Sequence, residues 1–404
     1  MTEAATAGPA STGVASTGAA EPGPPPRLIA MYNALDSIKL TAFAILSALI
    51  VGAFIIAISD LDALGTFDIG AIGSKIGRAY WAIPKGAFGS VSGLSEIITR
   101  TTPLIFAGLA VTLAFRSGLF NIGATGQMVS GGLAAAWVGF TLDAPGIVVI
   151  PVALIAAVFG GALCGAIPGV LKARTGAHEV IITIMMNYVI GFAALWLLKT
   201  STFVKPGRSD PVSKPVSVSA RLPRLFAPFG LERGEARAHI GFFLAIGAVV
   251  AVWWLLHRSK KGFELRAVGA NLDAARYAGM KPASLTIAAF VMSGGLAGLA
   301  GGSEILGTNY EATATLAGDI GFDAIAVALL GKSNPIGTAG AAFLFGVLEA
   351  GKRQVQIDAG VPLDLVLVLR ALIVLFIAAQ QLTRAIWRIK STDQGTQAFR
   401  GWGG

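Results

Sequence analysis

Long apolar runs recur along most of the chain and constrain its fold more than any other feature. Only 13% of the residues are charged, 54% are hydrophobic and 52 are glycine. A helix of about 20 apolar residues crosses a bilayer, and a soluble domain does not contain so many such runs. The sequence therefore predicts an all-α fold, a polytopic transmembrane helical bundle of about ten spans. We place the spans at 38–58, 100–115, 120–140, 146–171, 178–198, 240–257, 284–301, 318–331, 337–352 and 362–383.

Three of these runs are short. The runs at 100–115, 318–331 and 337–352 have roughly 14 to 16 residues, which barely cover the hydrocarbon thickness. Irregular backbone is tolerated at that depth only where protein or a water-filled cavity surrounds it. We therefore expect some of these runs to be broken or re-entrant helices beside a polar path.

Lys and Arg in the connections predict the orientation of the spans. They follow the second, fourth, sixth, eighth and tenth runs, and such residues collect on the cytoplasmic side. Both termini are then cytoplasmic, and outer loops are expected at about 59–99 and 199–239. Lys352 and Arg353 fall on the outer side and count against this orientation.

The ends of the chain differ in composition from the transmembrane domain, which we place at 38–390. Residues 1–27 are rich in Ala, Gly, Pro, Ser and Thr, which predicts a disordered tail, and a second tail covers 391–404. The net charge of +9 is best explained by cytoplasmic Lys and Arg facing anionic membrane lipid. No pattern of interleaved aromatic and basic residues points to nucleic acid.

The sequence contains no recognisable catalytic or metal-binding pattern. Gly331-Lys332-Ser333 resembles the end of a phosphate-binding loop, but Ala326 stands where that motif requires glycine. The single Cys164 lies in an apolar run, and the three histidines are far apart in the sequence. We therefore predict a chain that is not an enzyme, holds no metal or cofactor, and does not hydrolyse ATP by itself.

Polar residues are rare inside the runs, so each is a candidate for a solute path. Asn121, Thr125 and Gln127 open the third run, and the first two share one helical face that could present an amide and a hydroxyl to an uncharged solute. An N-cap role for Asn121 and interhelical hydrogen bonds for the other two remain open alternatives.

A second polar group lies in the fifth run. Glu179, Thr183 and Asn187 recur at every fourth residue, so they form one polar stripe on a helix. Such a stripe suits an aqueous cavity better than lipid.

Two charged residues lie deeper in the predicted spans. Asp323 lies in a short run with glycine at each end, as a broken helix near a solute path would have. An unpaired Arg370 in the tenth run would cost at least ~2.5–3.5 kcal/mol, so it needs a partner. Asp323, Glu349 and Asp364 are candidates, and a structural ion pair is the alternative to a solute contact.

One charged segment, 258–282, interrupts the apolar runs on the predicted cytoplasmic side. Asn271 is a favourable N-cap, and Gly279 followed by Pro282 ends a helix of about two turns. A helix this short has marginal stability alone in water. It is therefore expected either to dock on a partner or to be a solvated connector.

Glycine recurs at every fourth residue in two runs, which predicts close packing between helices. The residues are Gly161, Gly165 and Gly169 in the fourth run, and Gly294, Gly298 and Gly302 in the seventh.

Three segments together resemble the permease subunits of bacterial ABC importers for ribose, other simple sugars and branched-chain amino acids, with nucleoside permeases closest. They are 116–127 (RSGLFNIGATGQ), 262–279 (GFELRAVGAN, then AARYAG) and 330–337 (LGKSNPIG). The resemblance covers about residues 38–390. Thr125 departs from it, because that family more often has an acidic residue there.

The resemblance implies the fold of an ABC importer permease in the cytoplasmic membrane. It also implies several partners: a second permease subunit, two subunits that bind ATP and Mg²⁺ and hydrolyse ATP, and an extracytoplasmic solute-binding lipoprotein. The long outer loops favour a non-identical second permease. The segment 258–282 would be the coupling helix that docks in a groove of the ATPase. Its candidate contacts are Glu264, Arg266, Gly269, Asn271, Ala274, Ala275, Arg276 and Gly279.

The sequence thus predicts a subunit that moves a small polar solute inward, with a nucleoside first and a simple sugar next. The solute would cross between two permeases, past residues such as Asn121, Gln127 and Asn187. A secondary transporter driven by an ion gradient and a non-transporting scaffold are the rival hypotheses.

Overall fold

The computed structural model describes residues 26–58, 68–208, 210–227 and 236–388. Within these ranges the chain forms α-helices, short 3-10 and π segments and isolated β-bridges, but no extended strand. The all-α prediction is therefore confirmed. The tail expected over 1–27 lies outside the described residues except for its last two, which begin the first helix, and the tail expected over 391–404 lies outside them entirely.

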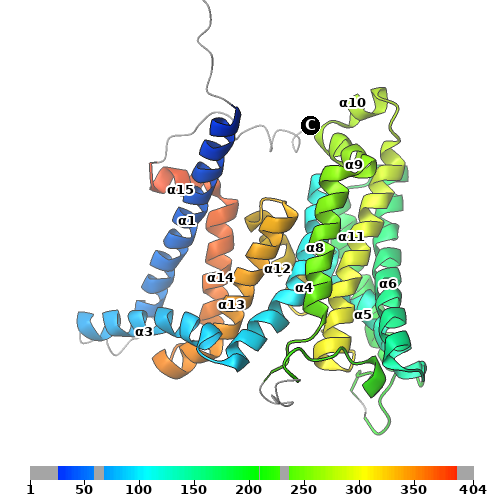
Figure 1. Cartoon of the computed structure of the whole chain (residues 1–404), viewed down its shortest axis with the longest axis horizontal. Helices are drawn as coiled ribbons and strands as arrows, with labels where there is room; N and C mark the ends of the chain where they lie inside the picture. The colour runs from blue at the N-terminus through cyan, green and yellow to red at the C-terminus, as the bar shows by residue number, and fades with distance from the viewer. Residues whose placement is uncertain (1–25, 59–67, 209, 228–235, 389–404) are drawn as a thin grey trace, which may run out of the picture.

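Most of the helices run side by side along one direction (Figure 1). They are α1 (Pro26–Ile58), α3 (Ile69–Phe88), α4 (Val91–Arg116), α5 (Ala124–Thr141), α6 (Gly146–Thr175), α7 (Glu179–Leu198), α8 (Gly241–Arg258), α9 (Lys260–Ala270), α10 (Leu272–Tyr277), α11 (Pro282–Glu304), α12 (Ile320–Leu330), α13 (Pro335–Ala359), α14 (Leu363–Ala378) and α15 (Gln380–Ile386), with the 3-10 helix η1 (Val218–Ala220) and the π segment η3 (Ile305–Asn309).

Six of the described helices are long and apolar enough to cross a membrane. They are the Lys39–Ile58 part of α1, then α4, α6, α7, α8, and α11 with η3. The expected number of about ten spans stays a prediction, because the other helices are shorter or more polar.

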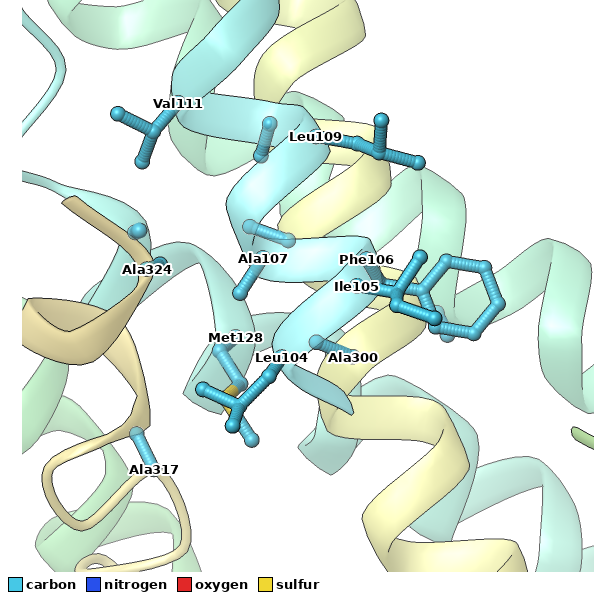
Figure 2. Packing of buried hydrophobic residues seen from close by; sticks show 14 of the residues in the cluster. Leu104, Ile105, Phe106, Ala107, Leu109, Val111, Met128, Ala300, Ala317 and Ala324 are labelled. Carbon is cyan, nitrogen blue, oxygen red and sulfur yellow. The ribbon is translucent and has the colours of Figure 1, made fainter. Parts of the chain in front are cut away.

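The bundle has two hydrophobic cores. The larger one contains buried residues from every helix between α4 and α13. Figure 2 shows part of it: Leu104, Ile105 and Leu109 of α4 with Met128 of α5 and Ala300 of α11. The smaller one joins α1, α3, α13 and α14. Figure 1 shows α4, α12 and α13 between α1 on one side and α6 on the other.

The glycine spacing holds α6 against α11. A side chain at Gly161 would overlap the carbonyl oxygen of Gly294, and one at Gly165 would overlap that of Phe290. The two backbones are therefore in direct contact, which only glycine permits at this distance. The predicted close packing is confirmed.

The segment 59–99, expected to be an outer loop, is largely helical where it is described. It contains α3 and the first turns of α4, which begins at Val91 after the N-cap Ser90. Figure 1 shows α3 lying across the direction of the other helices. Its polar and apolar residues alternate with helical periodicity rather than forming an apolar run, so a search for long apolar runs passes over it.

Two of the three runs expected to be short belong to long helices. α4 has 26 residues and α13 has 25. The second half of α13 packs on α3, and its polar residues are paired there: Lys85 of α3 lies 2.7 Å from Asp358. Hydropathy alone truncated these helices, because it does not register charges that are neutralised by partners elsewhere in the chain.

The third short run is a half-length helix. α12 has 11 residues, or roughly 16 Å at 1.5 Å per residue, about half the hydrocarbon thickness. Irregular backbone precedes it from Tyr310, where φ is +60°, and Leu316 in this segment packs against Gly132 of α5. This geometry agrees with the expectation of a broken helix at 318–331.

Candidate functional site

The connection between α4 and α5 is a buried polar turn. Asn121 donates from Nδ2 to Oε1 of Gln127 at 2.9 Å and to Oγ of Ser293 at 2.8 Å, and its Oδ1 accepts from the amide of Gly123. Ser293 of α11 in turn donates to the carbonyl of Ala110 in α4. Both Asn121 and Gln127 are fully buried, so in this conformation they join helices to one another.

The polar stripe of α7 holds the same turn from the other side. Oδ1 of Asn187 accepts from the amide of Gly126 at 2.8 Å, and Nδ2 donates to the carbonyl of Ile122 at 2.9 Å. Thr183 Oγ1 accepts from the amide of Ile122 at 3.3 Å. The spacing correctly placed these two residues on one face. That face points toward the turn between α4 and α5.

The remaining members of the two polar groups lie at the edges of this turn. Glu179 forms an ion pair with Lys172 of α6 at 2.9 Å. The hydroxyl of Thr125 is buried and has no hydrogen-bond partner among the described residues. Thr125 touches the start of α12, where a side chain on Gly321 would overlap that hydroxyl. The turn therefore contacts α7, α11 and the half-length helix α12.

Asp323 belongs to a different cluster. It lies 2.9 Å from Nη1 of Arg370, which is also 3.8 Å from Glu349 and lies over the ring of Phe345. Arg370 is only 9% exposed. Two of its three expected partners are thus present, whereas Asp364 is exposed at the start of α14. The cluster joins α12, α13 and α14, so the ion pair is a structural one in this conformation.

A charged cluster at the opposite end of α4 from the polar turn was not foreseen. Glu96 accepts from Nε of Arg100 at 2.7 Å and from Nη2 of Arg237 at 2.6 Å. The hydroxyl of Ser95 accepts from the amide of Ala238. Arg237 lies 141 positions from Glu96 in the chain, so no local pattern could reveal the contact. Only the four-residue spacing of Glu96 and Arg100 was visible.

The segment 258–282 folds into two helices, α9 and α10, at one end of the bundle (Figure 1). The predicted N-cap is present, because Oδ1 of Asn271 accepts from the amide of Ala274 at 2.9 Å. Gly279, which was predicted to end this helix, follows it in the left-handed conformation, with φ of +77°. α9 was missed. Ser259 caps it through the amide of Gly262, a signal that could have been read from the sequence.

Most residues of α10 are exposed, and one faces the bundle. Ala275 is 3% exposed and faces the bundle, whereas Leu272, Ala274, Arg276 and Gly279 face outward, and Tyr277 is 95% exposed. Asp273 and Arg276 lie 3.7 Å apart on this face. In α9, Glu264 pairs with Lys261 at 3.3 Å, and Nε of Arg266 donates to the carbonyl of Gly262.

Gly269 connects α9 to the polar turn. A side chain there would come within 2.6 Å of the amide nitrogen of Gly118. Gly118 has φ of +71°, so glycine is needed at this position to reverse the chain at the end of α4. The exposed helix pair therefore rests directly on the turn that Asn121 and Asn187 hold.

A groove of about 500 Å³ lies between α5, α6 and α7 and is open to the side of the bundle. Apolar side chains line it almost entirely, among them Trp137, Phe159 and Leu197. It suits a lipid acyl chain rather than a polar solute. In the described ranges, no group of three or more His, Cys, Asp and Glu side chains could hold a metal ion.

The chain matches a known protein family over most of its length. Residues 93–378 match the family described as branched-chain amino acid transport system / permease component. No solved structure matched the chain.

Individual relatives cover most of the chain. The guanosine ABC transporter permease protein NupP of Bacillus subtilis is 40% identical over 88% of this chain and 97% of its own length. The glucose ABC transporter permease protein TsgB13 of Haloferax volcanii is 32% identical over 88% and 90%. The nucleoside ABC transporter permease protein NupB of Lactococcus lactis is 36% identical over 73% and 81%. The two bacteria with Nup proteins each have a second matching permease, NupQ and NupC, both 26% identical.

A family match over this length agrees with the six helices, among those described, that are long and apolar enough to cross a bilayer. The chain is a multi-pass membrane protein and belongs to the branched-chain amino acid transport system / permease component family.

Proposed function

We propose that the chain is the transmembrane permease subunit of an ABC importer that moves a nucleoside into the cell. One observation carries the proposal: the exposed pair α9 and α10 rests through Gly269 on the turn that Asn187 fastens to α7. A push on α10 therefore acts through backbone contact on the helices of the bundle. A solvated connector would need no such contact.

The outward face of α10 has the chemistry of a docking surface. Tyr277 is nearly fully exposed, with Leu272 exposed on the same short helix. Tyrosine is enriched among residues that dominate binding energy, and an exposed aromatic ring beside an apolar side chain suits a groove on another protein. The groove would belong to a separate subunit that binds ATP and Mg²⁺, since this sequence has no complete phosphate-binding loop.

The remaining partners follow from the same proposal. NupP and NupQ, and NupB and NupC, are pairs of different permeases within one bacterium, which supports a non-identical second permease for this chain. An extracytoplasmic lipoprotein would deliver the solute. Figure 1 shows the start of α1 at the same end of the bundle as α9 and α10, which supports cytoplasmic termini.

The candidate path residues take a mechanical role in this scheme. Asn121, Gln127, Thr183 and Asn187 would set the position of α7 as the turn moves. Thr125, Glu179 and Asp323 lie at the edges of the moving parts. NupP and NupB support a nucleoside as the solute, and TsgB13 supports a sugar as the second candidate.

The coupling step can be tested with the double variant Glu264→Ala/Arg266→Ala. In the assembled transporter we expect ATP hydrolysis to continue while uptake of labelled guanosine is lost, because two charged side chains of the proposed coupling segment are removed. The matched control is Lys85→Ala on α3, at the opposite end of the bundle (Figure 1). Unchanged uptake in the double variant would refute the coupling role. Uptake abolished by an ionophore, with no need for an ATPase, would favour a secondary transporter.

A further inference from the structure

The outward face of α7 carries an unusual set of side chains. α7 is the least buried of the six helices that could cross a membrane. Ile181, Met185, Tyr188 and Phe192 lie on one side of it, at helical spacing, and each is more than half exposed. We call these four residues the α7 stripe.

Tyr188 sets the α7 stripe apart from a surface that faces lipid. Tyr188 lies at the middle of α7 and is 62% exposed. Nothing in the described ranges forms a hydrogen bond with its hydroxyl. Tyrosine in contact with lipid gathers at the membrane interfaces, and an unpaired hydroxyl in hydrocarbon is unfavourable. The middle of α7 is therefore expected to face something more polar than acyl chains.

Over residues 146–171, neighbouring α6 has an exposed surface without polar side-chain atoms, as expected of a surface that faces lipid. Its exposed large side chains are all aliphatic except Phe159, and none carries a polar atom. They are Ile147, Val148, Val152, Ile155, Val158, Phe159, Leu163, Ile167 and Leu171. The contrast indicates that α6 and the α7 stripe face different surroundings.

Hydrogen bonds on the opposite face of α7 fix the orientation of Tyr188. Thr183 and Asn187 lie on the opposite face of α7 and make the hydrogen bonds that hold Ile122 and Gly126. Turning α7 to bury Tyr188 would break these bonds and leave buried amide groups unpaired. The same bonds link α7 through the polar turn to Gly269 and the exposed helices, so the α7 stripe would move with them.

We propose that the α7 stripe is this chain's wall of the solute path, and that Tyr188 stacks on the heterocyclic base of a nucleoside. The inference rests on the proposed function, because it needs a solute with an aromatic base. Aromatic side chains stack on any base, and the hydroxyl of Tyr188 can pair with water or with a polar group of the solute. Phe192 lies one turn further along the same face and supplies a second ring.

The first experiment measures uptake of labelled guanosine by the complete transporter in vesicles. Tyr188→Leu should lower the uptake rate at low guanosine concentration by roughly 5- to 150-fold, the range expected from loss of one base-stacking contact. Tyr188→Phe keeps the ring and should retain most of the rate. The matched control is Phe159→Leu, an exposed aromatic residue on α6, which should stay within about twofold of the unaltered protein. Equal rates for Tyr188→Leu and Phe159→Leu would overturn the proposal.

The second experiment separates access to water from effects on folding. In a Cys164→Ala background, which removes the single cysteine, Tyr188→Cys and Phe159→Cys are compared for reaction with a charged, water-soluble thiol reagent. Only the thiolate reacts, and a thiol in lipid does not ionise. Tyr188→Cys should react at least about ten times faster, and guanosine should slow it. Equal rates, or no protection by guanosine, would contradict the assignment.

Uptake measurements distinguish a wrong solute from a wrong role for Tyr188. If the unaltered transporter imports glucose and not guanosine, the proposed nucleoside function is wrong and the stacking role falls with it. If guanosine is imported and Tyr188→Leu has no effect, the proposed function stands and the stacking role alone is refuted.

Discussion

The buried Arg370 cluster gives a quantitative test of how the bundle is held together. Arg370 is 9% exposed, with Asp323 at 2.9 Å and Glu349 at 3.8 Å. Removing one partner of a buried pair costs about 3–5 kcal/mol, because an uncompensated charge remains. Glu349 keeps part of the attraction but also pairs with Lys352. We therefore expect Asp323→Asn to lower the free energy of unfolding by about 3 kcal/mol.

The double variant Asp323→Asn/Arg370→Leu should be less destabilised than Asp323→Asn alone, because it leaves no unpaired charge in the interior. The control is Asp358→Asn. It breaks the more exposed Lys85 pair and should cost at most about 1 kcal/mol. Denaturant titration of the purified protein in detergent, followed by circular dichroism, measures all three. The reasoning is refuted if Asp323→Asn costs no more than Asp358→Asn, or if the double variant is the least stable.

Three further predictions concern packing, the polar turn and pH. Gly161→Ala should lower the free energy of unfolding by at least about 1–3 kcal/mol, because the new methyl group overlaps the backbone of α11. The control Gly191→Ala meets nothing within 4 Å and should be tolerated. Thermal unfolding compares the two variants. Asn187→Leu should lower the free energy of unfolding by roughly 2 kcal/mol, because two hydrogen bonds to backbone groups are lost. The backbone amides of the polar turn should then exchange with solvent faster, and exchange rates equal to those of the unaltered chain would contradict this prediction. Burial, assisted by Arg224, lowers the pKa of His239 to about 4, so the unfolded chain binds an extra proton between about pH 6.5 and 4. Stability should fall by roughly 3 kcal/mol as the pH falls through this window, and the fall should disappear in His239→Gln.

Local signals in the sequence predicted local structure well. The runs at 146–171 and 178–198 are close to α6 and α7, because both helices are apolar along nearly their whole length and so give an unbroken hydropathy signal. The predicted N-cap at Asn271 and the predicted helix end before Gly279 were also correct, since each depends only on neighbouring residues.

Features that depend on distant partners were missed or misjudged. The second half of α13 looked too polar for a helix in the bundle until Lys85 of α3 was found beside Asp358. The spacing of Thr183 and Asn187 placed them on one face of α7 but carried no information about what that face meets. The α7 stripe gives no signal in the sequence, because Met, Tyr and Phe do not interrupt an apolar run.

Uptake by the purified, reconstituted transporter is the most direct test of the central claim. The assay uses vesicles that contain this chain with its second permease and ATPase subunits, with labelled guanosine and the solute-binding protein outside the vesicles, and the ATP-binding subunits facing inward. We expect guanosine to accumulate inside only when the vesicles enclose ATP and Mg²⁺. Accumulation without ATP, driven by an ion gradient across the vesicle membrane, would contradict the assignment of this chain as an ABC importer permease.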